Sequence, residues 1–348
     1  MKIILSRTDN LGDVILTLPM AGALKQHFPG IHIIFLGKSY TRPVIEACEF
    51  VDEFLNWEEL KQMRDAGCGM EVREKLSCDA IIHVFPDKEI CRLAKQAGIP
   101  MRISTSHRLY TWLYCNKLVH YSRKKSNLHE AQLNMKLLEP LGITKEYSLA
   151  EIAGLYGLKR VCELRTTNYE IQDPASRIQD PASRIQDPAS VFQLILHPKS
   201  KGSAREWGLE NFSKLIALLP EDRYKIYVTG TKDEGDQMRG FLDQHDGRIT
   251  DLTGKLSLSE LITFINSCDG LVAASTGPLH IAAALGKRAI GIYAPMRPIF
   301  PQRWAPIGKN ADYLVLDKQC EACRKTMDCE CIRSIRPEAV VEMLERGR

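Results

Sequence analysis

Short strand-like and helix-like segments alternate along most of the chain, and this alternation constrains the fold more than any other feature. Apolar patterns predict strands at residues 2–6, 31–36, 79–85, 101–104, 192–197, 224–230, 270–274 and 289–293. Helical spacing predicts helices at residues 14–28, 43–50, 88–97, 127–141, 209–219, 235–244, 257–267, 279–285 and 337–346. Because strands that alternate with helices form parallel sheets with right-handed crossovers, the sequence predicts an α/β protein.

A tandem repeat divides this pattern into two halves. Residues 171–191 contain one seven-residue unit three times, Ile-Gln-Asp-Pro-Ala-Ser followed by Arg or Val. A heptad can indicate a coiled coil, but the proline of each unit (Pro174, Pro181 and Pro188) removes a helical hydrogen bond at a cost of about 3 kcal/mol. We therefore expect an exposed linker of loop or frayed turns at residues 166–191. It would join Rossmann-like domains at residues 1–165 and 192–348, which agrees with the length of 348 residues.

The charge balance excludes some classes of partner. Lys and Arg number 47 and Asp and Glu 43, so the formal net charge is +4. This small excess suits an anionic ligand or contact with an anionic membrane, but it is far from that of a nucleic-acid-binding protein. No apolar stretch is long enough to span a bilayer, and the first residues lack the long apolar region of a signal peptide. We expect a cytoplasmic protein that binds no nucleic acid.

The first predicted strand leads into Asn10-Leu11-Gly12-Asp13. Ligands of such sheets bind at the carboxyl ends of the strands, so we expect residues of the active site here. Gly12 allows a tight turn, and Asp13 stands at the start of a helix. Asp13 can be the N-cap of that helix or a general base at an interdomain cleft. Spacing alone favours the cap, and both interpretations can hold together.

Two segments of the second half resemble anion-binding sites. In the turn from residue 274 to 280, Thr276, Gly277 and the first helical N–H groups would face a phosphate, and His280 could donate to it or serve a structural role. The segment from residue 197 to 207 carries three cations, Lys199, Lys201 and Arg205, with small residues between them. These cations and Ser203 belong to the predicted donor set. Glu234, which follows a later strand, is a ribose partner by position only. No P-loop or G-x-G-x-x-G pattern is present.

Four cysteines near the carboxyl end form a Cys-x2-Cys and a Cys-x-Cys pair, at Cys320, Cys323, Cys329 and Cys331. This spacing is compatible with a structural tetrathiolate zinc site. The intervening loop of five residues is shorter than in most zinc ribbons, so we favour ordinary thiols in a packed loop. From the sequence we predict no metal site.

Taken together, these motifs resemble glycosyltransferase family 9, the lipopolysaccharide heptosyltransferase family. The similar segments are SRT and LGDVILTLP within residues 6–19, STGPLHIAAALG at residues 275–286, and His129, Glu130 and Asn134 before the linker. The resemblance implies a GT-B fold, with two Rossmann-like domains facing each other across a cleft. It also implies transfer of a heptose-type sugar, from a nucleotide donor such as ADP-heptose, to a lipopolysaccharide core or lipid A acceptor. The reaction would invert the anomeric carbon and use no metal or other cofactor.

The resemblance also implies roles for individual residues. Asp13 would be the catalytic base, and the acceptor would contact Asn10, Gly12, Arg123 and Lys124. The donor would contact Arg205, Ser275 and the backbone of the turn at Thr276 and Gly277. Two departures affect the donor site, since family members often have Asp where Ser275 stands and some have Lys where Arg205 stands.

A basic stretch of the first half contains interleaved aromatic residues. Its cations are Arg102, His107, Arg108, Lys117, Arg123, Lys124 and Lys125. It can be a solvated face, or it can meet a phosphorylated glycolipid at the inner face of the cytoplasmic membrane as a peripheral contact. Two other functions stay open, a nucleotide-sugar epimerase of the same fold and a non-catalytic nucleotide-sugar-binding protein.

Overall fold

The computed structural model describes residues 1–123, 125–161, 191–297, 299–317, 320, 323, 326 and 328–346. The repeat lies outside the described residues except for Val191, and so does Lys124. Among the helices of the described residues, none combines the length and hydropathy needed to cross a bilayer.

The first half is built on a parallel sheet of six strands in the order β3-β2-β1-β4-β5-β6. These strands are β1 (Lys2–Ser6), β2 (His32–Gly37), β3 (Glu53–Asn56), β4 (Ala80–His83), β5 (Met101–Thr105) and β6 (Lys117–Val119). Its α-helices are α1 (Leu11–Ile15), α2 (Leu18–His27), α3 (Arg42–Glu46), α4 (Trp57–Asp65), α5 (Gly69–Lys75), α6 (Lys88–Gln96), α7 (Leu109–Tyr114), α8 (Glu130–Met135) and α9 (Leu149–Ala153). Short 3-10 helices lie at Ser39–Thr41 and Lys136–Leu141.

The second half repeats this architecture with the order β12-β11-β10-β7-β8-β9. Its strands are β7 (Phe192–His197), β8 (Tyr224–Val228), β9 (Ile249–Asp251), β10 (Gly270–Ala274), β11 (Arg288–Tyr293) and β12 (Ala311–Val315). Its helices are α10 (Leu209–Leu218), α11 (Lys232–Gln237), α12 (Arg239–Gln244), α13 (Leu258–Ser267), α14 (Gly277–Ala284), α15 (Pro301–Trp304), α17 (Glu330–Arg333) and α18 (Pro337–Glu345). Numbered within its own half, each sheet has the strand order 3-2-1-4-5-6 of a Rossmann fold.

Several predicted elements are divided in the structure. The helix predicted at residues 14–28 is two helices, because Pro19 in the first turn of α2 lacks an N–H group and would clash with the turn before it. The helix predicted at residues 127–141 begins at Glu130 and continues from Lys136 as a 3-10 helix that contains Pro140. The segment at residues 235–244 falls into α11 and α12. The sequence prediction also missed the outermost strands of both sheets, which are β3, β6, β9 and β12.

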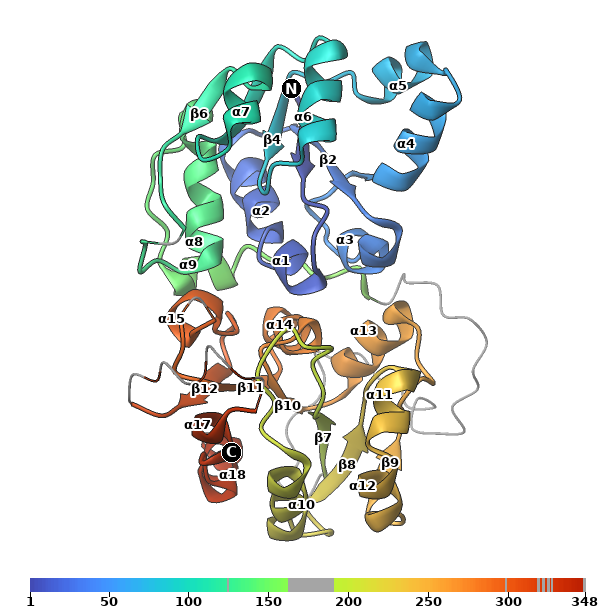
Figure 1. Ribbon diagram of the computed structural model, residues 1–348, viewed down its shortest axis with the longest axis vertical. Coiled ribbons are helices and arrows are strands. Elements are labelled where there is room, and N and C mark those ends of the chain that lie inside the picture. Colours follow the sequence, from blue (N-terminus) through green and yellow to red (C-terminus); the bar gives the residue numbers. More distant parts are fainter. Residues whose placement is uncertain are drawn as a thin grey trace.

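The two halves meet through helices that follow the carboxyl ends of their central strands. Figure 1 shows α1 of the upper half directly above α14 of the lower half, with α8 above α15. A Cβ atom on Gly277 would lie 2.7 Å from Leu11 Cδ2, so α1 and α14 are in direct contact. The buried core is also continuous across the two halves, since one apolar cluster contains residues of both. The carboxyl ends of the two sheets therefore face the same interface.

Candidate active site

Asp13 lies in the first turn of α1, directly after β1. Asn10 has the extended backbone of the N-cap position, so the interpretation of Asp13 as the N-cap is wrong. The Asp13 carboxylate instead accepts a hydrogen bond from Arg7 Nη2 at 2.5 Å. Its side chain is 14% exposed. Asp13 is therefore held by a specific partner beside the interface of the two halves.

Arg7 organises the carboxylates around Asp13. Its guanidinium is buried and lies 2.6 Å from Asp9 Oδ1 and 3.6 Å from Glu130 Oε1. Burial by itself lowers the pKa of Arg7, but the carboxylates of Asp9, Asp13 and Glu130 outweigh burial and raise it. The sequence analysis included Arg7 in a motif but assigned it no role. Its place between a predicted buried strand and two aspartates could have identified it as their partner.

Glu130 connects this group to the second half of the molecule. Glu130 Oε1 accepts from Arg123 Nε at 2.9 Å, and Oε2 accepts from Arg303 Nη2 of α15 at 2.9 Å. Burial alone would raise the pKa of Glu130, but Arg123, Arg7 and Arg303 together lower it. Next to it, His129 Nδ1 accepts from a backbone N–H, so Nε2 donates to the Ala305 carbonyl at 2.9 Å. The network of Arg7, Asp9, Asp13, Arg123, Glu130 and Arg303 thus joins the two halves.

The environment of Asp13 favours a proton acceptor that works near neutral pH. Burial, together with the charges of Asp9 and Glu130, raises the pKa of the Asp13 carboxyl to about 6 against the opposing effect of Arg7. A general base is most effective when its pKa lies near the working pH. Asp13 can therefore be ionised at neutral pH and still take up a proton.

Across the interface, α14 begins with the predicted phosphate-binding turn. Thr276 is the N-cap, but its side chain makes no capping hydrogen bond. A Cβ atom on Gly12 would lie 3.1 Å from His280 Cδ2, so the two motifs are in contact. Burial, together with nearby His129, lowers the pKa of His280 to about 3, so its imidazole is neutral. In the described part of the chain, Thr276 Oγ1 and His280 Nδ1 are buried without a hydrogen-bond partner.

A cavity of about 460 Å³ lies in the second half, between the segments that follow β7 and β8. Its lining residues are Lys199, Lys201, Gly202, Glu206, Thr231, Asp233, Glu234 and Gln237. Lys199 Nζ is paired with Glu206 Oε2 at 2.6 Å. The buried Glu234 carboxylate accepts from the backbone N–H groups of Thr231 at 2.8 Å and Lys201 at 3.2 Å. Three predicted donor residues, Lys199, Lys201 and Glu234, therefore share one cavity.

Other predicted donor residues point elsewhere. Ser203 Oγ donates to the Ser200 carbonyl at 2.7 Å. Arg205 donates from Nε and Nη2 to the Cys323 carbonyl at 3.1 and 2.9 Å. Ser275, Thr276, Gly277 and His280 belong to the α14 turn rather than to the lining of this cavity. Because Ala273 of β10 pairs with His197 of β7, the turn and the basic segment still leave adjacent strands at the same edge.

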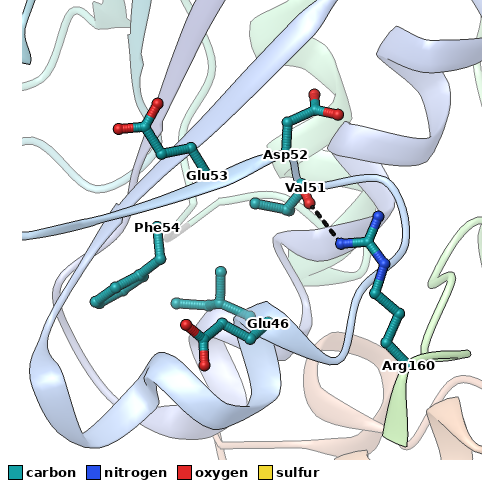
Figure 2. A pocket seen from close by; sticks show the side chains of 7 residues that line it. Glu46, Val51, Asp52, Glu53, Phe54 and Arg160 are labelled. Atoms are coloured by element: carbon teal, nitrogen blue, oxygen red, sulfur yellow. Dashed lines mark hydrogen bonds between the residues drawn. The ribbon is translucent and has the colours of Figure 1, made fainter. Parts of the chain in front are cut away.

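A second cavity, of about 280 Å³, lies beside β3 and α3 in the first half. Figure 2 shows its acidic lining by Glu46, Asp52 and Glu53, with Arg160 donating to the Val51 carbonyl at 3.2 Å. None of the predicted site residues lines it. For that reason this cavity is not the candidate active site.

Two Rossmann-type domains whose sheets face one interface with their carboxyl ends form the GT-B fold. The sequence model of glycosyltransferase family 9 (heptosyltransferase) matches residues 93–332, and the chain belongs to this family. The protein is therefore a glycosyltransferase.

Similar proteins agree with this assignment. Lipopolysaccharide heptosyltransferase 3 of Escherichia coli is 22% identical over 309 residues, which cover 84% of this chain and 82% of the relative. The solved structure of E. coli ADP-heptose lps heptosyltransferase II has a TM-score of 0.72 at 18% identity, covering 99% of this chain and 97% of that one. E. coli heptosyltransferase WaaC with ADP has a TM-score of 0.71 at 16% identity, covering 99% of both chains. At these identities the structural likeness shows the GT-B fold.

Proposed function

We propose that this protein transfers a heptose-type sugar from ADP-heptose to a lipopolysaccharide core acceptor, with inversion at the anomeric carbon and without a metal in the reaction. Family membership and the names of the relatives support the substrate classes. The observation that carries the proposal is Asp13, a carboxylate with a raised pKa beside the contact between α1 and α14. In this arrangement the acceptor binds to residues 1–165 and the donor to residues 192–348.

The proposed reaction needs a proton acceptor because a sugar hydroxyl is a poor nucleophile. The acceptor oxygen forms a bond to the anomeric carbon while the bond from that carbon to the diphosphate oxygen breaks. The hydroxyl proton passes to Asp13, whose carboxylate Arg7 orients. Asn10, which is exposed and makes no capping bond, and Gly12 are the proposed acceptor contacts on the same helix.

Arg123 and Lys124 were the other acceptor residues predicted from the sequence. Arg123 is held by Glu130 and by the Val84 carbonyl at 2.9 Å, so we propose that it shapes the acceptor site through Glu130. Lys124 lies outside the described residues.

The leaving diphosphate gains negative charge, which the second half is equipped to stabilise. Lys199 and Lys201 supply positive charge from the cavity of about 460 Å³. The first N–H groups of α14, at Thr276 and Gly277, supply hydrogen-bond donors and the positive end of a helix dipole. These groups replace the charge that a metal ion would otherwise provide.

A membrane-bound acceptor also requires a surface that meets the membrane. Helix α7 exposes Leu109, Trp112 and Leu113, which are 89%, 58% and 65% exposed. Arg108 precedes this helix and Lys117 follows it. Apolar side chains flanked by cations suit an anionic bilayer surface, so we propose that α7 makes a peripheral contact with the cytoplasmic membrane. Cosedimentation with vesicles that contain phosphatidylglycerol should weaken in Leu109→Ser/Trp112→Ser.

The decisive experiment combines donor binding with product analysis. ADP-heptose should raise the melting temperature more than other nucleotide-sugars, and a sugar–acceptor product should form only when a heptose-deficient core acceptor is added. An epimerase would convert the nucleotide-sugar without an acceptor. A binding protein would show the shift in melting temperature with no turnover. Either result would contradict the proposal.

A further inference from the structure

The four cysteines near the carboxyl end converge in space. The Sγ atoms of Cys320, Cys323 and Cys331 all lie within 4.8 Å of one another, and Cys329 Sγ is 2.9 Å from Cys323 Sγ. Cys323, Cys329 and Cys331 are each 2% exposed. None of these four cysteines forms a disulfide. A zinc ion bound by four sulfurs at about 2.3 Å would separate these sulfurs by about 3.8 Å. The sulfurs of Cys320, Cys323 and Cys331 lie in this range, whereas the 2.9 Å between Cys323 and Cys329 is shorter and would lengthen around a bound ion.

The surroundings of the sulfurs favour a metal over four packed thiols. A thiol is a weak donor and a weak acceptor, so four thiols in contact satisfy one another poorly. A divalent ion removes this conflict because it binds the deprotonated form and replaces each thiol proton.

We propose that Cys320, Cys323, Cys329 and Cys331 form a structural site for one thiophilic metal ion, namely zinc. A closed set of four thiolates leaves no open position, which is typical of structural rather than catalytic zinc. Tetrahedral sulfur ligands select zinc among the common divalent ions. The geometry thus reverses the interpretation that the sequence favoured, since the short loop between the two cysteine pairs still brings their sulfurs together.

The site would stabilise the segment that closes the second half. Cys329 is the N-cap of α17 and Cys331 lies within it. Asn211 Nδ2 donates to the Arg333 carbonyl at 2.8 Å, which attaches this segment to the start of α10. The Cys323 carbonyl accepts two hydrogen bonds from Arg205. A bound ion would therefore fix the backbone that positions Arg205, while taking no part in sugar transfer.

The first test is the metal content of the full-length protein, purified in reducing buffer without chelator or an affinity metal. Inductively coupled plasma mass spectrometry should find about one zinc per chain. A content far below one metal per chain overturns the site, whatever the variants do. One iron in place of zinc would overturn the choice of ion. Replacement by Co²⁺ should give the intense visible bands of a tetrahedral tetrathiolate, and weak octahedral bands would contradict it.

Variants then locate the ion. Cys323→Ser/Cys331→Ser should lose most of the zinc, whereas Cys68→Ser, outside the cluster and partly exposed, should keep it. A second control addresses the other group of potential ligands, buried His83, Cys91 and Cys115 in the first half. Cys91→Ser should retain the zinc; loss of zinc in this variant with retention in the double variant would place the ion there and overturn the proposal.

Discussion

The two halves of the molecule share one strand order but differ in what lies at the carboxyl ends of their sheets. In the first half, the residues after β1 form a dense network in which Arg7 binds Asp9 and Asp13. In the second half, the residues after β7 and β8 border an open cavity lined by Lys199 and Lys201. One half therefore presents a partly buried carboxylate, and the other presents two lysines in a cavity that Glu206, Asp233 and Glu234 also line.

This difference shows how one topology can supply two complementary roles. A proton acceptor needs burial, because loss of solvent raises the pKa of a carboxyl group toward neutrality. An anion site needs accessible cations and backbone N–H groups. Placing each on its own sheet allows both conditions to hold at one interface, where Arg303 of the second half binds Glu130 of the first.

The largest effect should follow from removing the proposed base. Asp13→Asn should lower kcat by about 10²- to 10⁴-fold, the usual contribution of a general base, and change donor affinity only a few-fold. It should not lower the melting temperature, because the raised pKa shows that burial disfavours the ionised carboxyl. Asp9→Asn, which removes another carboxylate from Arg7, should cost much less activity. Full activity of Asp13→Asn in a transfer assay would remove the base assignment.

Substitution of the cavity lysines in the second half should change the affinity for the donor rather than the rate of the chemical step. Lys201→Ala should weaken ADP-heptose binding by about 10- to 100-fold, since a hydrogen bond to a charged group contributes about 1.5–3 kcal/mol. Lys199→Ala should have a smaller effect because Glu206 already pairs with this lysine. Titration calorimetry measures both, and exposed Lys214 of α10 offers the control Lys214→Ala. Equal affinity in all three variants would relocate the diphosphate.

The histidines at the interface should make stability sensitive to acid. Burial lowers the pKa of His129 to about 4 and that of His280 to about 3. The unfolded chain binds these protons near pH 6.5 and the folded chain does not, so stability falls as pH drops from about 6.5 towards 4, by up to about 1.4 kcal/mol per pH unit for each histidine. Asp13 acts in the opposite sense because its pKa is raised.

Urea unfolding at several pH values checks this expectation. His280→Gln should reduce the slope of unfolding free energy against pH by about one proton. The same slope in the wild type and in this variant would contradict it.

A smaller effect should follow from crowding the contact between the halves. A Cβ atom on Gly277 would lie 2.7 Å from Leu11 Cδ2, so Gly277→Ala should destabilise the protein by about 1–3 kcal/mol. Gly240 of α12 has no neighbour within 4 Å of such an atom, so Gly240→Ala should be neutral or stabilising by up to about 1 kcal/mol. Thermal unfolding compares the two. Similar changes of melting temperature in the two variants would mean that α1 and α14 can move apart without loss of stability.

The smallest effect should come from shortening the repeat between the halves. Deleting residues 171–184 removes two of the three units. Loop closure depends only logarithmically on length, so the unfolding free energy should change by less than about 1 kcal/mol. A large fall in melting temperature would show that the repeat packs against the folded halves.

Much of the fold was predictable from local pattern. The limits predicted for β1, β7 and β10 match the structure, because each of these central strands contains a short run of buried apolar residues. The edge strands β3 and β6 were missed because they are short and partly exposed, so their apolar signal is weak. The break before Pro19 could have been anticipated from the clash that proline makes with the preceding turn.

The candidate site was predictable only in its parts. Asp13, Lys199, Lys201 and Glu234 were recognisable from their places after strands. The partners that define their chemistry were not, since Arg303 reaches Glu130 across 173 residues of sequence. The partner of Arg205 was also not predictable. The basic motif suggested that it binds the donor, but its guanidinium donates to the Cys323 carbonyl, 118 residues away.

By itself, the order of residues determined the alternation of strands and helices, the two halves and the motifs at the ends of the strands. These depend on neighbours within a few positions, through backbone sterics and the periodicity of apolar side chains. Tertiary structure alone decided which charges surround Asp13, which donor residues share a cavity, and that four cysteine sulfurs meet. Those outcomes depend on burial and on distances between remote segments, which the chain acquires only when its two sheets pack together.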